Sequence, residues 1–275
     1  MIGRFRGLFV AVPLALAGVL TGFGAGAFDA KEVAQLRDTN ECARCDLAEA
    51  NLKDLDHQGA DLARADLVDA DLKGSNLTGA DLSGADLRRA DLEKSTLKDA
   101  NFVGATGAGV DMEKSIADGI DLSGSDFRNA DMGESSLVAA LLVEADLGGV
   151  DLKRSDLTGA DMRAAKLQRA NLERATMRGV NLSQADLSRA ELDRADLTGA
   201  DLSSAVLKNA QLNRANLSGA NLKDADLTGA VLKRTNLSGA NLEGVRGLKA
   251  RQLEDACGDG KTQLPDDEFV LAICP

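Results

Sequence analysis

The sequence offers almost no aromatic side chains with which to fill a core. It has no tryptophan and no tyrosine, and only seven phenylalanines among 275 residues. Because 44% of the residues are nonetheless hydrophobic, any core must be packed mainly from small aliphatic side chains.

Histidine is equally scarce, which limits the chemistry. His57 is the only one, so a metal site with two histidine ligands or a Ser-His-Asp arrangement would have to be built around a single residue. The Gly-Lys-Thr run at 260–262 lacks the earlier glycine of a phosphate-binding loop, because Asp255 stands there. We therefore predict no catalytic residues, no metal, no cofactor and no enzymatic activity.

Basic residues are in the minority. The chain has 32 Lys and Arg against 44 Asp and Glu, which gives a formal net charge of -12. This balance disfavours direct binding of nucleic acid or attraction to anionic lipid. It is compatible with a protein that mimics nucleic acid.

The first 27 residues have the pattern of a secretory signal. Arg4 and Arg6 precede the apolar run of residues 7–23, and Ala25-Gly26-Ala27 fits a small-residue cleavage site. We predict that residues 1–27 are removed and that the protein is exported, periplasmic or secreted, with no retained membrane span. A retained anchor is the alternative, although the run is near the short end for a span.

A five-residue repeat occupies the middle of the chain. Residues 45–244 divide without a gap into 40 units, and the third residue is leucine in 31 of them. Five residues turn an α-helix by about 500°, and an odd period would alternate the leucines between the two faces of a flat strand. Neither regular element suits the pattern.

Each unit is predicted to form one extended side and one corner. The first and third residues, typically Ala and Leu, point inward, while the Asp or Asn between them points outward. Glycine at the fifth position supplies the positive φ that a type II turn requires. Four units make one coil, because fifth-position residues recur at multiples of twenty: glycine at 59, 79, 119, 159, 179, 199, 219 and 239, and arginine at 154, 174, 194, 214 and 234.

Units such as Ala200-Asp201-Leu202-Ser203-Ser204 and Ala220-Asn221-Leu222-Lys223-Asp224 resemble the A-(D/N)-L-x-x motif of the pentapeptide-repeat family. The resemblance covers about 200 of the 275 residues. It implies an all-β fold, a right-handed quadrilateral β-helix (a solenoid of about ten four-sided coils) with small and Leu or Phe side chains inside. The coils of such a fold stack about 4.8 Å apart.

Three units depart most from the motif, because His57, Gly107 and Ala117 stand at leucine positions. The coil with Gly107 and Ala117 is underfilled unless larger neighbours compensate. We predict local repacking there, with a functional bulge as the alternative. The candidates for filling the space are Phe102, Val110, Ile120 and Phe127.

Both ends of the array are predicted to carry short helical or irregular caps. Residues 28–44 contain a possible short helix, and residues 245–275 read as a helical turn, a Gly-rich turn and a short apolar strand. Uncovered, the ends of a stacked coil would expose unpaired strand edges and an apolar cross-section.

All four cysteines belong to these ends. Only the pairings Cys42–Cys45 and Cys257–Cys274 avoid crossing ten coils, and an exported chain meets oxidising conditions. We therefore favour two structural disulfides. Free thiols or a reactive Cys42–Cys45 pair are the alternatives, and the C-x-x-C spacing also fits half a zinc site.

Outward-facing carboxylates are abundant, and most have a structural explanation. The second residue is Asp or Asn in 29 of the 40 units, and short polar side chains beside a turn bond backbone amides. Five successive aspartates stacked in one column could gather a cation: Asp71, Asp91, Asp111, Asp131 and Asp151.

The arginine column is the candidate binding site. Stability alone does not favour stacked guanidinium groups, because they repel one another. Arginine is, however, tolerated at a solvated corner, and duplication of a coil copies its residues. As a site, the column would bind a polysaccharide, a lipid head group or an acidic protein through Arg154, Arg174, Arg194, Arg214 and Arg234.

These observations favour a non-enzymatic exported scaffold whose flat repeat faces bind a protein or an anionic surface. The family resemblance adds an alternative, because some pentapeptide-repeat proteins resemble duplex DNA in width and charge and bind type II topoisomerases. An acidic rod fits that shape. A signal sequence opposes it, because a topoisomerase partner lies in the cytoplasm.

Overall fold

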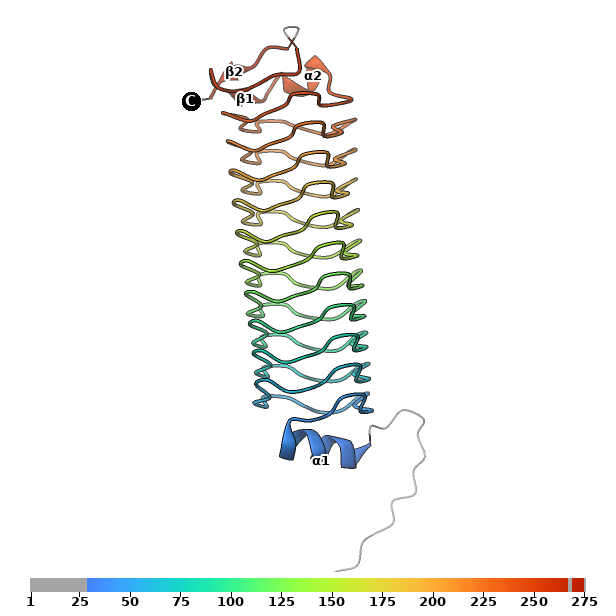
Figure 1. The fold of residues 1–275 in the computed structure, drawn as a ribbon. Coiled ribbons are helices and arrows are strands. Elements are labelled where there is room, and N and C mark those ends of the chain that lie inside the picture. The colour runs from blue at the N-terminus through green and yellow to red at the C-terminus, as the bar shows by residue number, and fades with distance from the viewer. Residues whose placement is uncertain (1–28, 267–268, 275) are drawn as a thin grey trace, which may run out of the picture.

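A computed structural model describes residues 29–266 and 269–274. The chain winds into a long stack of coils, with helix α1 (Ala30–Thr39) at one end and helix α2 (Ala250–Leu253) with strands β1 (Cys257–Gly258) and β2 (Ala272–Ile273) at the other (Figure 1). No helix in this part of the chain has the length and hydropathy of a membrane span. The predicted signal, residues 1–27, lies outside the described residues.

The coils have the predicted period of twenty residues. Parallel bridges join the second residue of each unit to the residue twenty positions later, from Glu41 with Asp61 to Asp226 with Arg246. Between neighbouring coils, Leu77 N–H donates to Thr96 O at 2.7 Å and Asp81 N–H donates to Ala60 O at 2.9 Å. Residues twenty apart therefore lie in columns along the rod.

The sides of the coils are shorter than strands. Each contributes one isolated bridge, and only β1 and β2, which pair in parallel, form a ladder among the described residues. The reason is the corner that ends every unit: Ala80 N–H, for example, donates to Leu77 O at 3.0 Å across the turn. The fifth residue of every unit from Arg44 to Gly244 has a φ between 52° and 72°, and 25 of these residues are not glycine.

Four sides can be named from one coil. Side A contains residues 145–147, side B residues 150–152, side C residues 155–157 and side D residues 160–162, and every other coil repeats them at multiples of twenty. The fourth and fifth residues of each unit form the corner that follows it. We call the corner between sides A and B the A/B edge, and the corner between sides B and C the B/C edge.

The core is the axis of the rod, as the repeat predicts. Almost all first and third residues are buried; Ala200 is 1% and Leu182 0% exposed, whereas Leu55 is only partly buried. The underfilled coil is repacked: a side chain on Gly107 would lie 2.6 Å from Cε1 of Phe127, so this ring occupies the space of the missing leucine. Phe127 also packs edge to face on Phe102, with ring centroids 6.1 Å apart. The bridges continue through these coils without a bulge.

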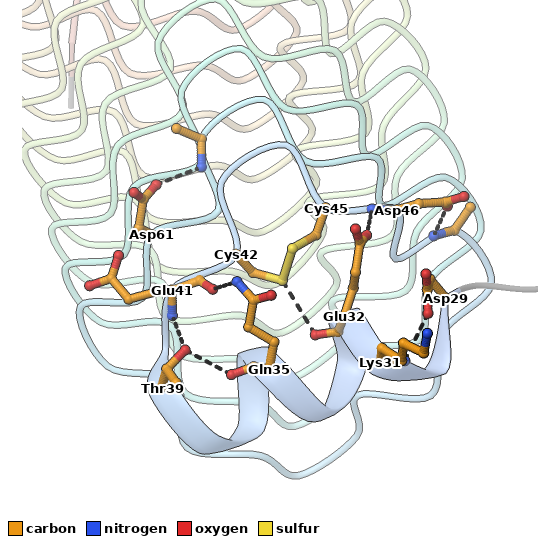
Figure 2. The surroundings of a disulfide bond; sticks show 12 residues. Asp29, Lys31, Glu32, Gln35, Thr39, Glu41, Cys42, Cys45, Asp46 and Asp61 are labelled. Atoms are coloured by element: carbon orange, nitrogen blue, oxygen red, sulfur yellow. Dashed lines mark hydrogen bonds between the residues drawn. A yellow bond between two sulfur atoms is a disulfide. The ribbon is translucent and has the colours of Figure 1, made fainter.

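Helix α1 covers the N-terminal end of the axis. Asp29 caps its start by accepting a 2.8 Å hydrogen bond from Lys31 N–H, and Asn40, with φ 58°, ends it. Val33 and Leu36 are buried against the first coil. Side chains of the helix also bond backbone groups of the first coil: Glu32 accepts from Asp46 N–H and Gln35 donates to Glu41 O (Figure 2). Arg37 donates to Asn51 O.

The coil begins one unit earlier than the predicted array. Glu41 is bridged to Asp61 and Arg44 has the corner φ of 64°, so residues 40–44 already form a unit. Cys42 takes the leucine position of that unit and Cys45 the first position of the next, and their disulfide lies inside the coil under α1 (Figure 2). The motif does not identify this unit, because cysteine replaces leucine at its third position.

The C-terminal cap continues two sides of the rod but not a third. Cys257 bridges to Asn236 on side C and Gln263 to Asn241 on side D, at separations of 21 and 22 residues. The Cys257–Cys274 disulfide holds β2 beside β1. On side B the chain instead turns into the four-residue helix α2, so this side has no bridge beyond Val231 in the described part of the chain.

Candidate anion-binding site

The predicted arginine column lies at the B/C edge. Its five residues are exposed and have corner φ angles between 58° and 62°. An L-residue in this left-handed region is strained by roughly 1–2 kcal/mol compared with glycine. The column consists of Arg154, Arg174, Arg194, Arg214 and Arg234.

Ion pairs divide this column into two parts. Arg154 lies 3.1 Å from Glu134, and Nε of Arg174 lies 3.4 Å from Glu173. Glu173 also pairs with Lys153, whose hydrogen bond lowers the pKa of the carboxyl group. The other three arginines form no ion pair within residues 29–266 and 269–274: Arg194, Arg214 and Arg234.

The unpaired arginines line a shallow groove of about 340 Å³ together with Asp193, Asn213 and Lys233. The one carboxylate in this groove is already engaged. Asp193 Oδ1 accepts hydrogen bonds of 2.8 Å from both the backbone N–H and the side-chain amide of Asn213. The groove therefore presents stacked guanidinium groups that are open to a ligand with several negative charges.

A second basic corner faces the first across side B, and the sequence analysis missed it. Arg169 and Arg189 lie at the A/B edge and line a groove of about 420 Å³ with Lys208. Neither arginine has an ion pair among the described residues, whereas Lys208 lies 3.4 Å from Asp226. Their spacing of twenty was a usable signal, but a run of only two was too short to stand out.

Several arginines elsewhere on the rod are neutralised within their own coil, although Arg44 and Arg64 at the corner between sides D and A form no ion pair among the described residues. Arg88, Arg128 and Arg163 each fold back onto the aspartate two residues earlier, at 2.6 to 2.7 Å. The bond from Arg163 lowers the pKa of Asp161 below its ordinary value. Lys94 and Lys114, which extend the B/C column toward the N-terminus, are likewise paired with the preceding glutamates. Unpaired guanidinium groups on both edges thus distinguish side B of the C-terminal half.

The aspartate column does not form a metal site. No group of three or more His, Cys, Asp or Glu suited to an ion occurs in the described residues. Burial raises the pKa of Asp111, with a further contribution from the charges of Asp91 and Asp131, and a 2.9 Å hydrogen bond from Glu113 N–H opposes the shift. At the end of the run asparagine relieves this stacking: Asn171, the next residue of the column, donates to Asp151 at 3.1 Å.

His57 and the cysteines serve the cap. His57 is 3% exposed, and its Nδ1 lies 2.8 Å from Oδ1 of Asn40. All four cysteines are in the disulfides favoured by the sequence, Cys42–Cys45 and Cys257–Cys274. Buried in the axis, the Cys42–Cys45 pair has no access to a substrate.

The repeat agrees with one protein family throughout. The family model for pentapeptide repeats matches eight copies, which together cover residues 45–246. The chain is a pentapeptide-repeat protein. This membership implies a right-handed quadrilateral β-helix, and the proteins of this family are generally structural or binding proteins rather than enzymes. No curated protein gives a significant match to the chain.

Solved pentapeptide-repeat proteins are among the similar structures. HetL, involved in heterocyst differentiation regulation in the cyanobacterium Nostoc sp. strain PCC 7120, is 35% identical, with coverage of 73% of this chain and 91% of HetL and a TM-score of 0.44. QnrB1, a plasmid-mediated fluoroquinolone resistance protein, is 20% identical, with coverage of 67% and 91% and a TM-score of 0.45. A protein from the Arabidopsis thaliana thylakoid lumen is 35% identical over 39% of this chain and 80% of that protein, with a TM-score of 0.29.

Proposed function

We propose that this pentapeptide-repeat protein is a non-enzymatic exported scaffold that binds an anionic partner on side B of its C-terminal half. The observation that carries the proposal is the set of guanidinium groups left unpaired on both edges of that side: Arg169 and Arg189 at the A/B edge, and Arg194, Arg214 and Arg234 at the B/C edge.

The energetics of these positions support a binding role. Stacked like charges repel one another, so stability alone does not favour a run of unpaired arginines. The chain contains 44 acidic residues and pairs arginines such as Arg128 with them elsewhere. Side B therefore keeps its guanidinium groups available although partners for them are abundant. The same cations disfavour mimicry of nucleic acid by this side, because a mimic presents negative charge.

Export is proposed on two grounds. Residues 1–27 have the composition of a secretory signal, and the two disulfides, which tie down both end caps, are stable in oxidising compartments. Fractionation of the producing cell with N-terminal sequencing tests this. We expect a periplasmic or secreted protein that begins near Phe28. A cytoplasmic protein with an intact N-terminus would reject export and favour a cytoplasmic partner.

Binding is tested with a matched pair of triple variants. One variant replaces the unpaired B/C residues, Arg194→Gln, Arg214→Gln and Arg234→Gln, and the other makes the same charge change at paired positions, Arg88→Gln, Arg128→Gln and Arg163→Gln. On immobilised heparin at about 0.15 M salt, only the first variant should elute early. Its melting temperature should stay within about 2 °C of the wild type. Equal loss of retention in both variants would show that net charge, not this side, determines binding.

A further inference from the structure

The C-terminal end of side B carries a groove that the arginine edges do not explain. It has a volume of about 570 Å³ and lies between residues 228–233 of the last coil and the segment around α2. Sides C and D are extended past the last regular coil by Cys257 and Gln263. We call each such further side a rung. Side B lacks a rung here, because its chain forms α2 instead.

Two backbone donors along the groove have lost their acceptors. One coil earlier, Asn209 N–H donates to Thr228 O at 2.9 Å and Leu212 N–H donates to Val231 O at 2.8 Å. The residues twenty positions later are Gly229 and Leu232, and within the described ranges their N–H groups donate to nothing. Leu232 is about 1% exposed, and an unpaired buried amide is costly.

The protein's own chain fills the positions on either side of this gap. Gln252 Nε2 donates to Ala230 O at 2.8 Å, in place of the backbone amide of a further coil. Arg234 N–H donates to Asp255 O at 3.0 Å. The unfilled part of the rung therefore needs two acceptors with the spacing of carbonyls three residues apart in the coil. An extended polypeptide that bends at the corner, as the coil itself does at Gly229, provides two such acceptors through its backbone carbonyls.

The side chains around the gap indicate what kind of peptide fits. Val231 is 37% exposed at the floor of the groove and offers an apolar contact. Lys249 and Arg251 line the groove and form no ion pair in the part of the chain that the structure describes. Lys233 is only weakly engaged, 3.8 Å from Asp255. Glu254 and Asp255 also line the groove, so three cations stand against two carboxylates. A strand with alternating apolar and acidic residues would match the cationic part of this lining, at Lys249 and Arg251.

We propose that this groove is a strand-addition site for an extended acidic segment of a partner protein. Two carbonyls of the segment accept hydrogen bonds from Gly229 and Leu232, and its carboxylates meet Lys249 and Arg251. The inference deepens the proposed function, on which it rests for the anionic nature of the partner. It identifies that partner as a polypeptide, because a polysaccharide or a lipid head group does not present amide carbonyls in a row.

The test is amide hydrogen exchange of the mature protein with a synthetic peptide of four Val-Glu repeats. Bound peptide at ten times its Kd should slow exchange at Gly229 and Leu232 by about tenfold. The amide of Leu212, which already donates to Val231 O of the next coil, is the internal control and should not change. A peptide of four Val-Lys repeats should protect neither position.

Two variants separate this inference from the proposed function. The double variant Lys249→Gln, Arg251→Gln should weaken the peptide but leave retention on heparin intact, whereas the triple arginine variant of the B/C edge should do the reverse. Protection of Leu232 by heparin alone would overturn the peptide assignment. So would protection that grows with protein concentration without peptide, because a second copy would then be the occupant. Absence of protection at saturating peptide would reject the site.

Discussion

Replacing His57 with leucine should stabilise the N-terminal end of the rod. His57 occupies an axial position that leucine fills in most other units. Since its Nδ1 faces an acceptor, Oδ1 of Asn40 at 2.8 Å, the ring proton lies on Nδ1 and Nε2 carries a bare lone pair. Nε2 is buried without a hydrogen-bond partner among the described residues. An unsatisfied buried polar atom costs about 1–3 kcal/mol, and His57→Leu removes that cost.

The gain should grow on acidification. Burial lowers the pKa of His57 below 6.5, and the charge of Arg37 lowers it further, while Asp56 acts in the opposite direction. A histidine with a depressed pKa in the folded state contributes stability above the unfolded-state pKa. That stability is lost as the pH falls from about 6.5 toward the folded-state pKa, at up to about 1.4 kcal/mol per pH unit. The leucine variant has no titrating group at this position, so it does not lose this stability as the pH falls.

Amide exchange in α1 is the appropriate assay, because the stability of a solenoid is local. Val33 and Leu36, buried under the first coil, should exchange more slowly in His57→Leu than in the wild type at pH 7.5, and the difference should be larger at pH 5. Gln58→Leu, a change at the adjacent exposed corner, is the matched control and should give neither effect. An equal pH dependence in wild type and His57→Leu would refute the assignment of the buried neutral ring.

Three further predictions follow from the columns and the caps. Leu182→Ala should cost about 2–5 kcal/mol by leaving a cavity in the axis, whereas Ser183→Ala should cost under about 0.5 kcal/mol; equal shifts in urea unfolding would contradict the inward and outward assignment. Asp111→Asn should raise the melting temperature at pH 7 slightly, because it removes a carboxyl whose pKa is raised in the folded state; since protonation removes the same charge, the advantage should shrink as the pH falls through the raised pKa and be absent below about pH 4, and a constant advantage would argue against a charge effect. The double variant Cys257→Ser, Cys274→Ser should lose about 3 kcal/mol of local stability in the chain-entropy model, seen as proteolysis confined to the C-terminal cap; cleavage within the coils would contradict this.

The fold was predictable because one short rule repeats. A period of five and a recurrence of twenty predict which residues point inward, where the corners lie and how long a coil is. Leu47 and Leu242, at opposite ends of the array, are both buried as this rule predicts. The rule fails where composition changes. Cysteine replaces leucine at Cys42, so the motif does not identify the first unit. The missing rung of side B results from the helical turn after Lys249, which the repeat pattern does not predict.

The binding site was predictable only in outline. The spacing of twenty predicts the arginine column, but it does not predict the ion pairs that neutralise Arg154 and Arg174. Pairing depends on whether a carboxylate at the fourth position, or on the coil before, is free to turn toward the guanidinium. Asp193 is not, because Asn213 holds it. These contacts form between side chains of neighbouring coils, so the order of residues along the chain does not predict them.

Because bridges join only residues about twenty positions apart, the number of coils sets the separation of the two caps and nothing else. Excising residues 105–124 would remove one turn, bring α1 closer to α2 by about 4.8 Å, and leave both ends chemically unchanged. The distance between the two caps therefore changes in steps of one coil. If its ends engage different structures, the gap between those structures is encoded in the gene as a multiple of sixty nucleotides.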